Sequence, residues 1–497
     1  MGVVLRQSIK GTIVTYTGAF IGFVNTLFIF THFLTPEEIG LQRIIIEAGM
    51  MLATLSQLGV PNLGVRFFPH FKSADGKNNG FLLYLIFLPL LGMLFFFTLF
   101  ILLKAPVSTY FAENSELFVN YYYYILPLAV AIVYQAIFST YANVLMRIVV
   151  PRFITEIGVR VFLLVGVLLY SFDMINLNGF VLSIVLTYLL AAIINFIYLF
   201  TIGKVSFKRT KGFVTAKMRK EMILYSLYLL AAVLMSILSL KIDVFMVSAK
   251  IGLASTAIYS IAYYMAVIIE MPSRSTISII SPIISNSIKE NNWKDVKDNY
   301  RKVSSLQYFM GIMIFILLWI NVDNIFHFIP NGEFYEEGKY VILFIGLGKL
   351  VEMLFSMSGT ILSYSSKYRY TLLFTFFYGV MIISTNNWLI PIYGVTGAAL
   401  ATFGSIFVFR LVYIFFVWGT LKVHPFSWSH LSMTGLLMLC IGINFLLPTL
   451  ENVYLDAAMR SVIVLGTFCL IAYFGKICLD ANNIFDAMVK KLMKRKD

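Results

Sequence analysis

Long apolar stretches alternate with short polar connectors from one end of the chain to the other. A helix that crosses a membrane needs about 20 mostly apolar residues, and we expect such helices at residues 9–32, 40–66, 80–103, 121–146, 153–172, 178–202, 222–249, 254–275, 304–328, 338–364, 369–388, 394–418, 430–448 and 457–478. The pattern therefore predicts an all-α, polytopic membrane protein with about fourteen transmembrane helices. The longest connectors, 203–221 and 276–303, are charged and are predicted to lie as amphipathic helices on the membrane surface.

The composition agrees with lipid as the main solvent. Of the 497 residues, 60% are hydrophobic and only 12% are charged, and the mean hydropathy is +0.86. Soluble domains carry about 25% charged residues. Since so few polar groups could not cover a water-exposed surface, much of this chain must contact lipid.

Lysine and arginine gather in every second connector. The basic connectors include the N-terminal Arg6 and Lys10, the run between Lys204 and Lys220, and the C-terminal MVKKLMKRKD. This alternation holds across all fourteen predicted spans, and the positive-inside rule then places both termini in the cytoplasm. The net charge of +14 is thus a topology signal, with binding to anionic membrane lipids as a secondary consequence. We expect no nucleic-acid partner.

Two segments suggest an internal repeat. GFVLSIVLTYLLAAIINFIYLF at 179–200 and GAALATFGSIFVFRLVYIFFVW at 397–418 both start with glycine after a short outer turn, on predicted spans 6 and 12. Two six-helix lobes in the same orientation would be parallel repeats about an axis along the membrane normal. The predicted division is an N-terminal lobe at 1–212, a C-terminal lobe at 213–421, and two additional helices with a basic cytoplasmic tail at 422–497.

We single out eleven of the ionisable side chains within the predicted spans, because each costs roughly 2.5–3.5 kcal/mol at the bilayer centre. Ten form close pairs of opposite sign and one is alone: Arg43 and Glu47, Glu156 and Arg160, Lys241 and Asp243, Glu270 and Arg274, Lys349 and Glu352, and the single Arg410. Most partners are three or four residues apart, so they share a helix face.

We interpret most of these charges as the lining of a hydrated substrate-binding cavity between the two lobes, because water would remove most of the insertion cost. The candidate site residues are Arg43, Glu47, Lys241, Asp243, Glu270, Arg274, Lys349, Glu352 and Arg410. The alternative is that each pair is a self-neutralised defect whose side chains reach the interface. That alternative is favoured for Glu156 and Arg160, which lie close to the cytoplasmic face, and it stays open for Arg274.

Motifs for catalysis are missing from the sequence. The chain has no Walker A motif, no H-E-x-x-H, no G-x-S-x-G and no zinc-ligand spacing. We therefore expect no catalytic residue, no cofactor and no metal site. The outer connectors are also too short for the domain that a membrane enzyme of lipid-linked sugars usually needs, which favours a transporter and leaves that enzyme as a third alternative.

Three stretches resemble a known family. THFLTPEEIGLQ at 31–42, LKIDVFMVSAKIGLASTAIYSIAYYM at 240–265 and YGVTGAALAT at 393–402 are similar to the helix entries of polysaccharide transporter (PST), or O-antigen flippase-like, proteins. These proteins form a branch of the multidrug/oligosaccharidyl-lipid/polysaccharide (MOP) superfamily. The resemblance covers essentially the whole chain, although its motifs are degenerate.

The resemblance implies a multi-pass flippase of the bacterial inner membrane. Such a protein moves a polyprenyl-pyrophosphate-linked oligosaccharide, for example an O-antigen unit of lipopolysaccharide, to the outer leaflet by alternating access. Family cavities are built largely from helices 1, 2, 7 and 8, which the following residues match: Arg43, Glu47, Lys241, Asp243, Glu270 and Arg274. The first span carries no charge between Lys10 and His32, unlike that of lipid II flippases, so the resemblance favours the surface-polysaccharide type.

The expected partners are the lipid-linked oligosaccharide, membrane lipids and the polysaccharide polymerase machinery. Protons or sodium ions are candidate coupling ions through Glu47 or Asp243. The main alternative function is cation-coupled multidrug and toxin extrusion on the same fold, which would call for an acidic C-terminal lobe. Here the acids among the candidate site residues are each paired with lysine or arginine.

Overall fold

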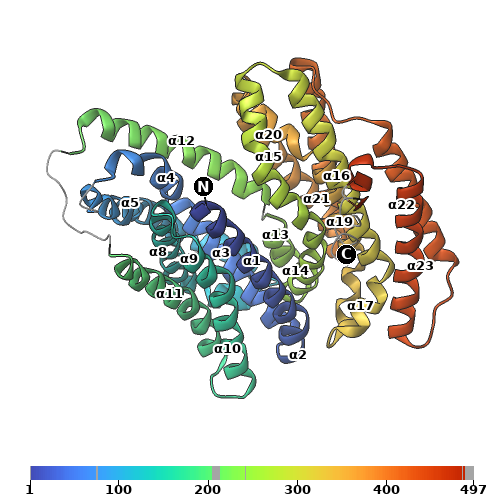
Figure 1. The fold of residues 1–497 in the computed structure, drawn as a ribbon. Helices are drawn as coiled ribbons and strands as arrows, with labels where there is room; N and C mark the ends of the chain where they lie inside the picture. The colour runs from blue at the N-terminus through green and yellow to red at the C-terminus, as the bar shows by residue number, and fades with distance from the viewer. Residues whose placement is uncertain (1, 74–76, 204–212, 241, 484, 487–497) are drawn as a thin grey trace, which may run out of the picture. The chain divides into compact units, whose positions relative to one another are not determined.

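The structure is a computed structural model that describes residues 2–73, 77–203, 213–240, 242–483 and 485–486. All regular secondary structure in these ranges is helical (Figure 1). The chain divides into two compact units, Met1–Ala257 (unit 1) and Ile258–Asp497 (unit 2). This division is based on contacts between residues. The predicted boundary near residue 212 is based on the sequence repeat, and the repeat stays a prediction.

Unit 1 is built from helices that cover the first six predicted spans and the start of the second half. Its elements are α1 (Gly2–Val24), η1 (Asn25–Ile29), α2 (Phe30–Phe33), α3 (Pro36–Ser56), α4 (Val60–Phe71), η2 (Asn78–Gly80), α5 (Phe81–Leu102), α6 (Lys104–Phe111), α7 (Glu116–Asn120), η3 (Tyr122–Tyr124), α8 (Ile125–Val144), α9 (Val149–Phe153), η4 (Ile154–Gly158), α10 (Val159–Ser171), α11 (Leu177–Thr201), α12 (Ala216–Leu240), α13 (Ile242–Lys250) and the first residues of α14 (Leu253–Val267).

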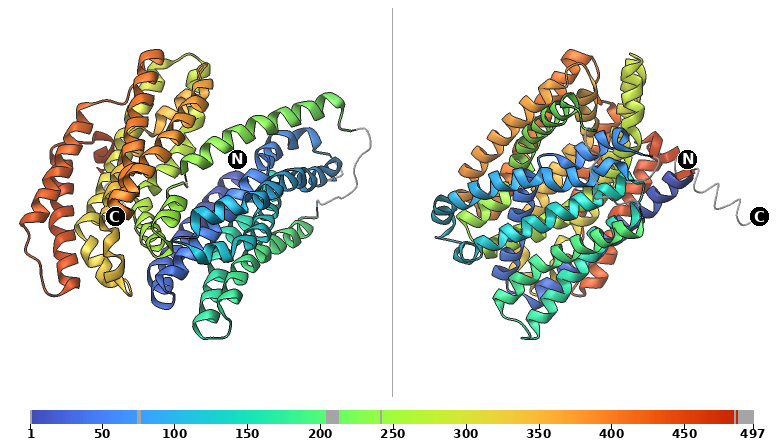
Figure 2. Two further views of the ribbon diagram at one scale, coloured as in Figure 1. Left: turned by 180° about the vertical axis from the view of Figure 1, so that it is seen from behind. Right: turned by 90° about the vertical axis from the view of Figure 1, so that its left-hand side faces the viewer.

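Unit 2 contains the remainder of α14 and the later helices. These are η5 (Ile268–Glu270), α15 (Met271–Lys289), α16 (Trp293–Ile320), α17 (Val322–Phe328), α18 (Gly332–Tyr335), η6 (Glu336–Gly338), α19 (Lys339–Leu354), α20 (Ser356–Tyr364), α21 (Arg369–Leu421), α22 (Trp428–Leu446) and α23 (Val453–Phe474). The last two lie side by side and form the trailing pair (Figures 1 and 2).

Local sequence signals set the limits of the helix that carries the first charge pair. The side chain of Thr35 accepts a hydrogen bond from the backbone N–H of Glu38, and the Glu38 side chain accepts one from the Thr35 N–H. This capping box and Pro36 start α3. The helix ends before Leu58 (φ 50°) and Gly59 (φ 71°), whose left-handed backbone separates α3 from α4.

The core of unit 1 is centred on α8, which packs against α3, α4 and α11. Ile45 of α3, Leu128 and Ile137 of α8, and Ile184 of α11 are fully buried. By contrast, large side chains on α5, such as Leu94 and Phe95, are 71% and 64% exposed. Apolar side chains that point away from the protein indicate a lipid-facing surface.

In unit 2, α19 packs between α16 and α21, and α21 is a hairpin rather than a straight helix. Its backbone leaves helical geometry at Gly394 (φ 58°, ψ −136°), a conformation that favours glycine. The ring of Phe374 lies 5.0 Å from that of Phe416, and the hydroxyls of Thr385 and Ser405 are 3.0 Å apart. The two halves of α21 therefore run antiparallel against each other.

Among the described residues, eleven helical segments are long and apolar enough to cross a membrane, or twelve with the bent segment that joins Gly332–Leu354 to Ser356–Tyr364. The chain thus has a polytopic membrane fold, and its described residues contain fewer candidate spans than the fourteen predicted. The difference lies in two places. The α21 hairpin covers both 369–388 and 394–418, and the predicted span 222–249 is divided between α12 and α13 around residue 241, outside the described residues.

Candidate functional site: buried charge clusters in each unit

In unit 1, Arg43 and Glu47 form the ion pair that their spacing predicts. A guanidinium nitrogen of Arg43 lies 2.7 Å from Glu47 Oε1, with 31% of the Arg43 side chain exposed and only 3% of the Glu47 side chain. A buried carboxylate needs a cation or hydrogen bonds to offset its lost hydration. Arg43 provides that charge while part of its guanidinium side chain remains open, so Glu47 is the buried partner and Arg43 the accessible one.

A second pair in unit 1 joins Glu156 and Arg160 at 2.9 Å, with 30% and 27% of the side chains exposed. Glu156 lies in η4, a π-helical turn, and Asn25 in the π-helical η1 donates a hydrogen bond to the carbonyl of Arg160 at 3.0 Å. The π-helical turn η1 is therefore connected through a side-chain amide to the start of α10, directly after η4. Such π turns occur frequently at functional sites.

The third predicted pair is described only in part. Lys241 lies outside the described residues. Asp243 is 4% exposed in α13, and its Oδ1 accepts a hydrogen bond from the N–H of Val244 at 3.0 Å. The burial of Asp243 agrees with its predicted place within a span.

Unit 2 brings four of the predicted site residues into one cluster. Lys349 Nζ lies 2.8 Å from Glu270 Oε2 and 2.9 Å from Glu352 Oε2. Arg410 contacts the other oxygen of Glu352 at 3.4 Å. We call these residues the unit 2 network. The sequence paired Glu270 with Arg274, whose side chain lies outside the described residues, and left Arg410 alone; in the structure Glu270 bonds to Lys349, and Arg410 contacts Glu352.

The two cations of this network are neutralised unequally. Lys349 has two carboxylates within 3 Å, and its side chain is 11% exposed. Arg410 has one carboxylate contact at 3.4 Å, beyond the 2.7–2.9 Å typical of charge-assisted hydrogen bonds. Its helix position shares a side with Ile406, Tyr413 and Val417, which are buried, so Arg410 faces the protein interior and is the less neutralised cation.

The network lies next to two interruptions in helical geometry. Glu270 ends the 3₁₀ segment η5, and Glu352 lies just before a 44° bend that follows Leu354. The bend frees backbone groups that need partners within a membrane. The Ser304 hydroxyl donates to the carbonyl of Leu354, and that of Ser356 donates to Gln307 Oε1 at 2.5 Å. The bend is thus built into the fold by polar contacts with α16.

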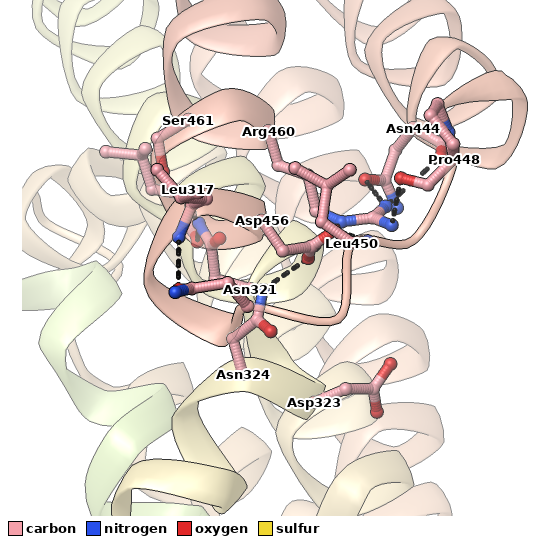
Figure 3. A network of polar contacts seen from close by, with 12 residues as sticks. Leu317, Asn321, Asp323, Asn324, Asn444, Pro448, Leu450, Asp456, Arg460 and Ser461 are labelled. Carbon is pink, nitrogen blue, oxygen red and sulfur yellow. Dashed lines mark hydrogen bonds and ion pairs between the residues drawn. The ribbon is translucent and has the colours of Figure 1, made fainter.

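The sequence prediction missed one buried ion pair, Asp456 with Arg460 in α23 (Figure 3). Arg460 Nε lies 2.6 Å from Asp456 Oδ2, and the two residues are 7% and 5% exposed. The guanidinium also donates to Asn444 Oδ1 at 2.8 Å and to the carbonyl of Pro448 at 3.2 Å. The sequence contains a signal for this pair, because Asp456 and Arg460 have the same spacing of four residues that predicts the pair of Arg43 and Glu47.

These contacts give Asp456 and Arg460 a structural role. Asn324 of α17 donates to Asp456 Oδ2 at 2.7 Å, and Asn321 donates to the hydroxyl of Ser461 at 3.0 Å (Figure 3). All three guanidinium nitrogens of Arg460 have acceptors within the protein. The cluster therefore anchors the trailing pair to the end of α16 and to α17. The guanidinium of Arg460 is already occupied by contacts within the protein.

The fold is that of a multi-pass membrane transporter. A solved structure titled "Lipid II flippase MurJ, inward closed conformation" is similar with a TM-score of 0.74 and 16% identity, covering 95% of this chain and 100% of that one. A structure titled "Inward-facing conformation of a multidrug resistance MATE family transporter of the MOP superfamily" is similar with a TM-score of 0.61 and 14% identity, covering 82% and 94%.

The chain belongs to the family described as "Polysaccharide biosynthesis protein", whose profile matches residues 4–288. The MatE family profile matches residues 228–388. A comparison with curated proteins found no significant match. The chain is thus a PST-like transporter of the MOP superfamily and not an enzyme, as the resemblance of its helix entries predicted.

Proposed function

We propose that this transporter moves a polyprenyl-pyrophosphate-linked oligosaccharide, a repeat unit of a surface polysaccharide such as O-antigen, across the bacterial inner membrane. The family match over residues 4–288 supports a role in polysaccharide biosynthesis. One observation carries the substrate class. Each unit holds a partly accessible arginine beside a carboxylate: Arg43 in unit 1, with 31% of its side chain exposed, and Arg410 in unit 2, with 20% exposed and a contact of 3.4 Å. A diphosphate is the type of anion that such groups bind.

The proposed topology has fourteen membrane crossings with both termini in the cytoplasm. Its support is the alternation of basic connectors along the sequence and the hairpin form of α21, which supplies two antiparallel helices. We assign the repeated lobes to 1–212 and 213–421, and the appended helices and tail to 422–497. A cysteine introduced at Glu451 should then react with an impermeant reagent from outside, and one introduced at Lys422 should react only from inside.

In this mechanism a phosphate of the ligand binds the guanidinium of Arg43 or that of Arg410, and the carboxylate beside each arginine stays within its own unit. When Arg410 turns to the ligand, Glu352 stays bonded to Lys349 at 2.9 Å, so at Arg410 the exchange breaks only the 3.4 Å contact. A ligand that prefers one arrangement of the lobes shifts their equilibrium by its difference in affinity. Outward movement of a negative headgroup also gains about 2.3 kcal/mol per charge for each 100 mV of inside-negative potential.

The remaining candidate residues complete the proposed cavity. Lys241, Asp243 and Arg274 join Glu47 and Glu270 as its lining, and Glu47 or Asp243 is the candidate site for a coupling proton or sodium ion. Both carboxylates are buried, 2% and 4% exposed. Glu47→Gln and Asp243→Asn should each reduce polymer export; normal export by both variants would rule out coupling through these groups.

The decisive experiment deletes the gene in its host and locates the lipid-linked sugar that accumulates. We expect it in the cytoplasmic leaflet, with export restored by the wild type but not by Arg43→Ala, Lys241→Ala or Arg410→Ala. Glu156→Gln is the control, because that pair lies outside the proposed cavity. Unchanged surface polymer in the deletion strain, with the lipid-linked sugar still reaching the outer leaflet, would contradict the proposal.

Multidrug extrusion is the second candidate, favoured by the MatE profile match over residues 228–388. A cationic drug would need free carboxylates in unit 2. Lys349 instead lies between Glu270 and Glu352, at 2.8 and 2.9 Å, which reduces their attraction for a cation. New sensitivity to cationic dyes in the deletion strain, together with unchanged surface polymer, would favour this candidate.

A further inference from the structure

Unit 1 has an open pocket of about 380 Å³ between α4 and the start of α12. It is lined by Phe67 and His70 of α4, by Phe213 and Thr215 before α12, and by Lys217 and Glu221 within α12. This region joins predicted spans 6 and 7, which the positive-inside rule places at the cytoplasmic surface. The pocket is separate from the buried pairs Arg43–Glu47 and Glu156–Arg160.

Aromatic rings form the floor of this pocket. Phe67 is 5% exposed, and its ring lies 6.1 Å from Tyr225 and 6.2 Å from His70. The guanidinium of Arg66 stacks 4.3 Å above the ring of Tyr225. This contact holds a positive charge beside the pocket without neutralising it, because an aromatic face supplies no formal charge.

The pocket also presents one ammonium and one carboxylate on α12. Lys217 and Glu221 are exposed and one helical turn apart, and within the described part of the chain neither forms an ion pair. A lysine placed four residues before a glutamate is the less favourable order for pairing on a helix. Both charges are therefore available to a ligand that carries the two opposite charges close together.

The same face of α12 continues as an apolar surface. Leu224 and Tyr228 follow Glu221 by three and seven residues, so they lie on its side of the helix. Their side chains are 57% and 48% exposed. A ligand whose head occupies the pocket can thus lay a hydrocarbon chain along α12.

We propose that this pocket binds a phospholipid with a phosphoethanolamine headgroup from the cytoplasmic leaflet. Lys217 and Arg66 bind the phosphate, as basic pockets at the cytoplasmic side of membrane helices do. Glu221 accepts hydrogen bonds from the primary ammonium, which also lies against the face of Phe67. The acyl chains follow Leu224 and Tyr228. A phosphoglycerol head offers no cation to Glu221, and a phosphocholine head has no N–H donor for it.

The test uses the full-length protein in detergent with phosphatidylethanolamine, phosphatidylcholine or phosphatidylglycerol that carry identical acyl chains, and measures bound lipid by native mass spectrometry. We expect phosphatidylethanolamine to bind at least about fivefold more tightly than the other two. Lys217→Gln should weaken the binding of all three lipids, because each carries the phosphate, and Glu221→Gln should remove the preference for phosphatidylethanolamine. Lys220→Gln, which removes the same charge next to the pocket, should keep it.

Three results would overturn the proposal. They are equal or tighter binding of phosphatidylglycerol, an unchanged preference in Glu221→Gln, and an effect of Lys220→Gln as large as that of Lys217→Gln. Far-ultraviolet circular dichroism and the gel-filtration profile of each variant verify that it is folded. Polymer export is a separate readout, since this site does not depend on the identity of the transported substrate.

Discussion

The charged side chains within the predicted spans are neutralised in different ways in unit 1 and in unit 2. In unit 1, Arg43 with Glu47 and Glu156 with Arg160 are local pairs on single helices. In unit 2, Lys349 joins carboxylates from η5 and from its own helix, and Glu352 reaches Arg410 on α21. A local pair can change its environment when one helix moves, whereas the unit 2 network connects several helices and resists separation.

Replacement of Lys349 should have the largest effect on this comparison. Lys349→Met leaves Glu270 and Glu352 without their shared cation, and loss of one partner from a buried ion pair costs about 3–5 kcal/mol. We expect a strongly lowered midpoint of thermal unfolding in detergent. Lys349→Arg keeps the charge and is the control; equal midpoints for Lys349→Met and the wild type would contradict the network.

The pair in unit 1 should respond unequally to loss of either partner. Arg43→Met removes the ion-pair partner of the buried Glu47 and should cost about 2–3 kcal/mol. Glu47→Gln leaves Arg43, whose side chain is 31% exposed and can turn to water, so we expect about 1 kcal/mol. Unfolding of both variants under one set of conditions measures the difference, and a larger loss in Glu47→Gln would reverse our assignment of the buried partner.

Replacement of Arg410 should reduce transport strongly and stability only slightly. Its 3.4 Å contact with Glu352 should contribute no more than about 1 kcal/mol, as weak ion pairs do. Arg410→Gln should therefore unfold near the wild-type midpoint while polymer export falls by about tenfold or more. Arg410→Lys tests whether charge alone is enough, and normal export by Arg410→Gln would remove this residue from the proposed site.

The smallest effect is expected at the second pair of unit 1. The side chains of Glu156 and Arg160 are 30% and 27% exposed. Water can therefore solvate the charge that remains when its partner is replaced. Glu156→Gln should change stability by about 0.5 kcal/mol and leave export unchanged. A loss of export at unchanged stability would instead place this pair in the transport pathway.

Much of the fold was predictable because each membrane span is indicated by the apolar residues of its own segment. The apolar runs at 80–103 and 178–202 correspond to α5 and α11, since a lipid-facing helix needs the same composition along its length. The bend after Leu354 was not predicted. It depends on Ser304 and Gln307 of another helix, and no local pattern contains that information.

The sequence by itself determined the solvent, the class of fold and the local ion pairs, because hydropathy and an i,i+4 spacing act within one helix. The spacing of Arg43 and Glu47 predicts their ion pair in this way. Only the tertiary structure decided that Glu270 bonds to Lys349, that Arg410 contacts Glu352, and that Asp456 and Arg460 anchor the trailing pair. Those contacts join residues far apart in the chain, and their partners are set by helix packing.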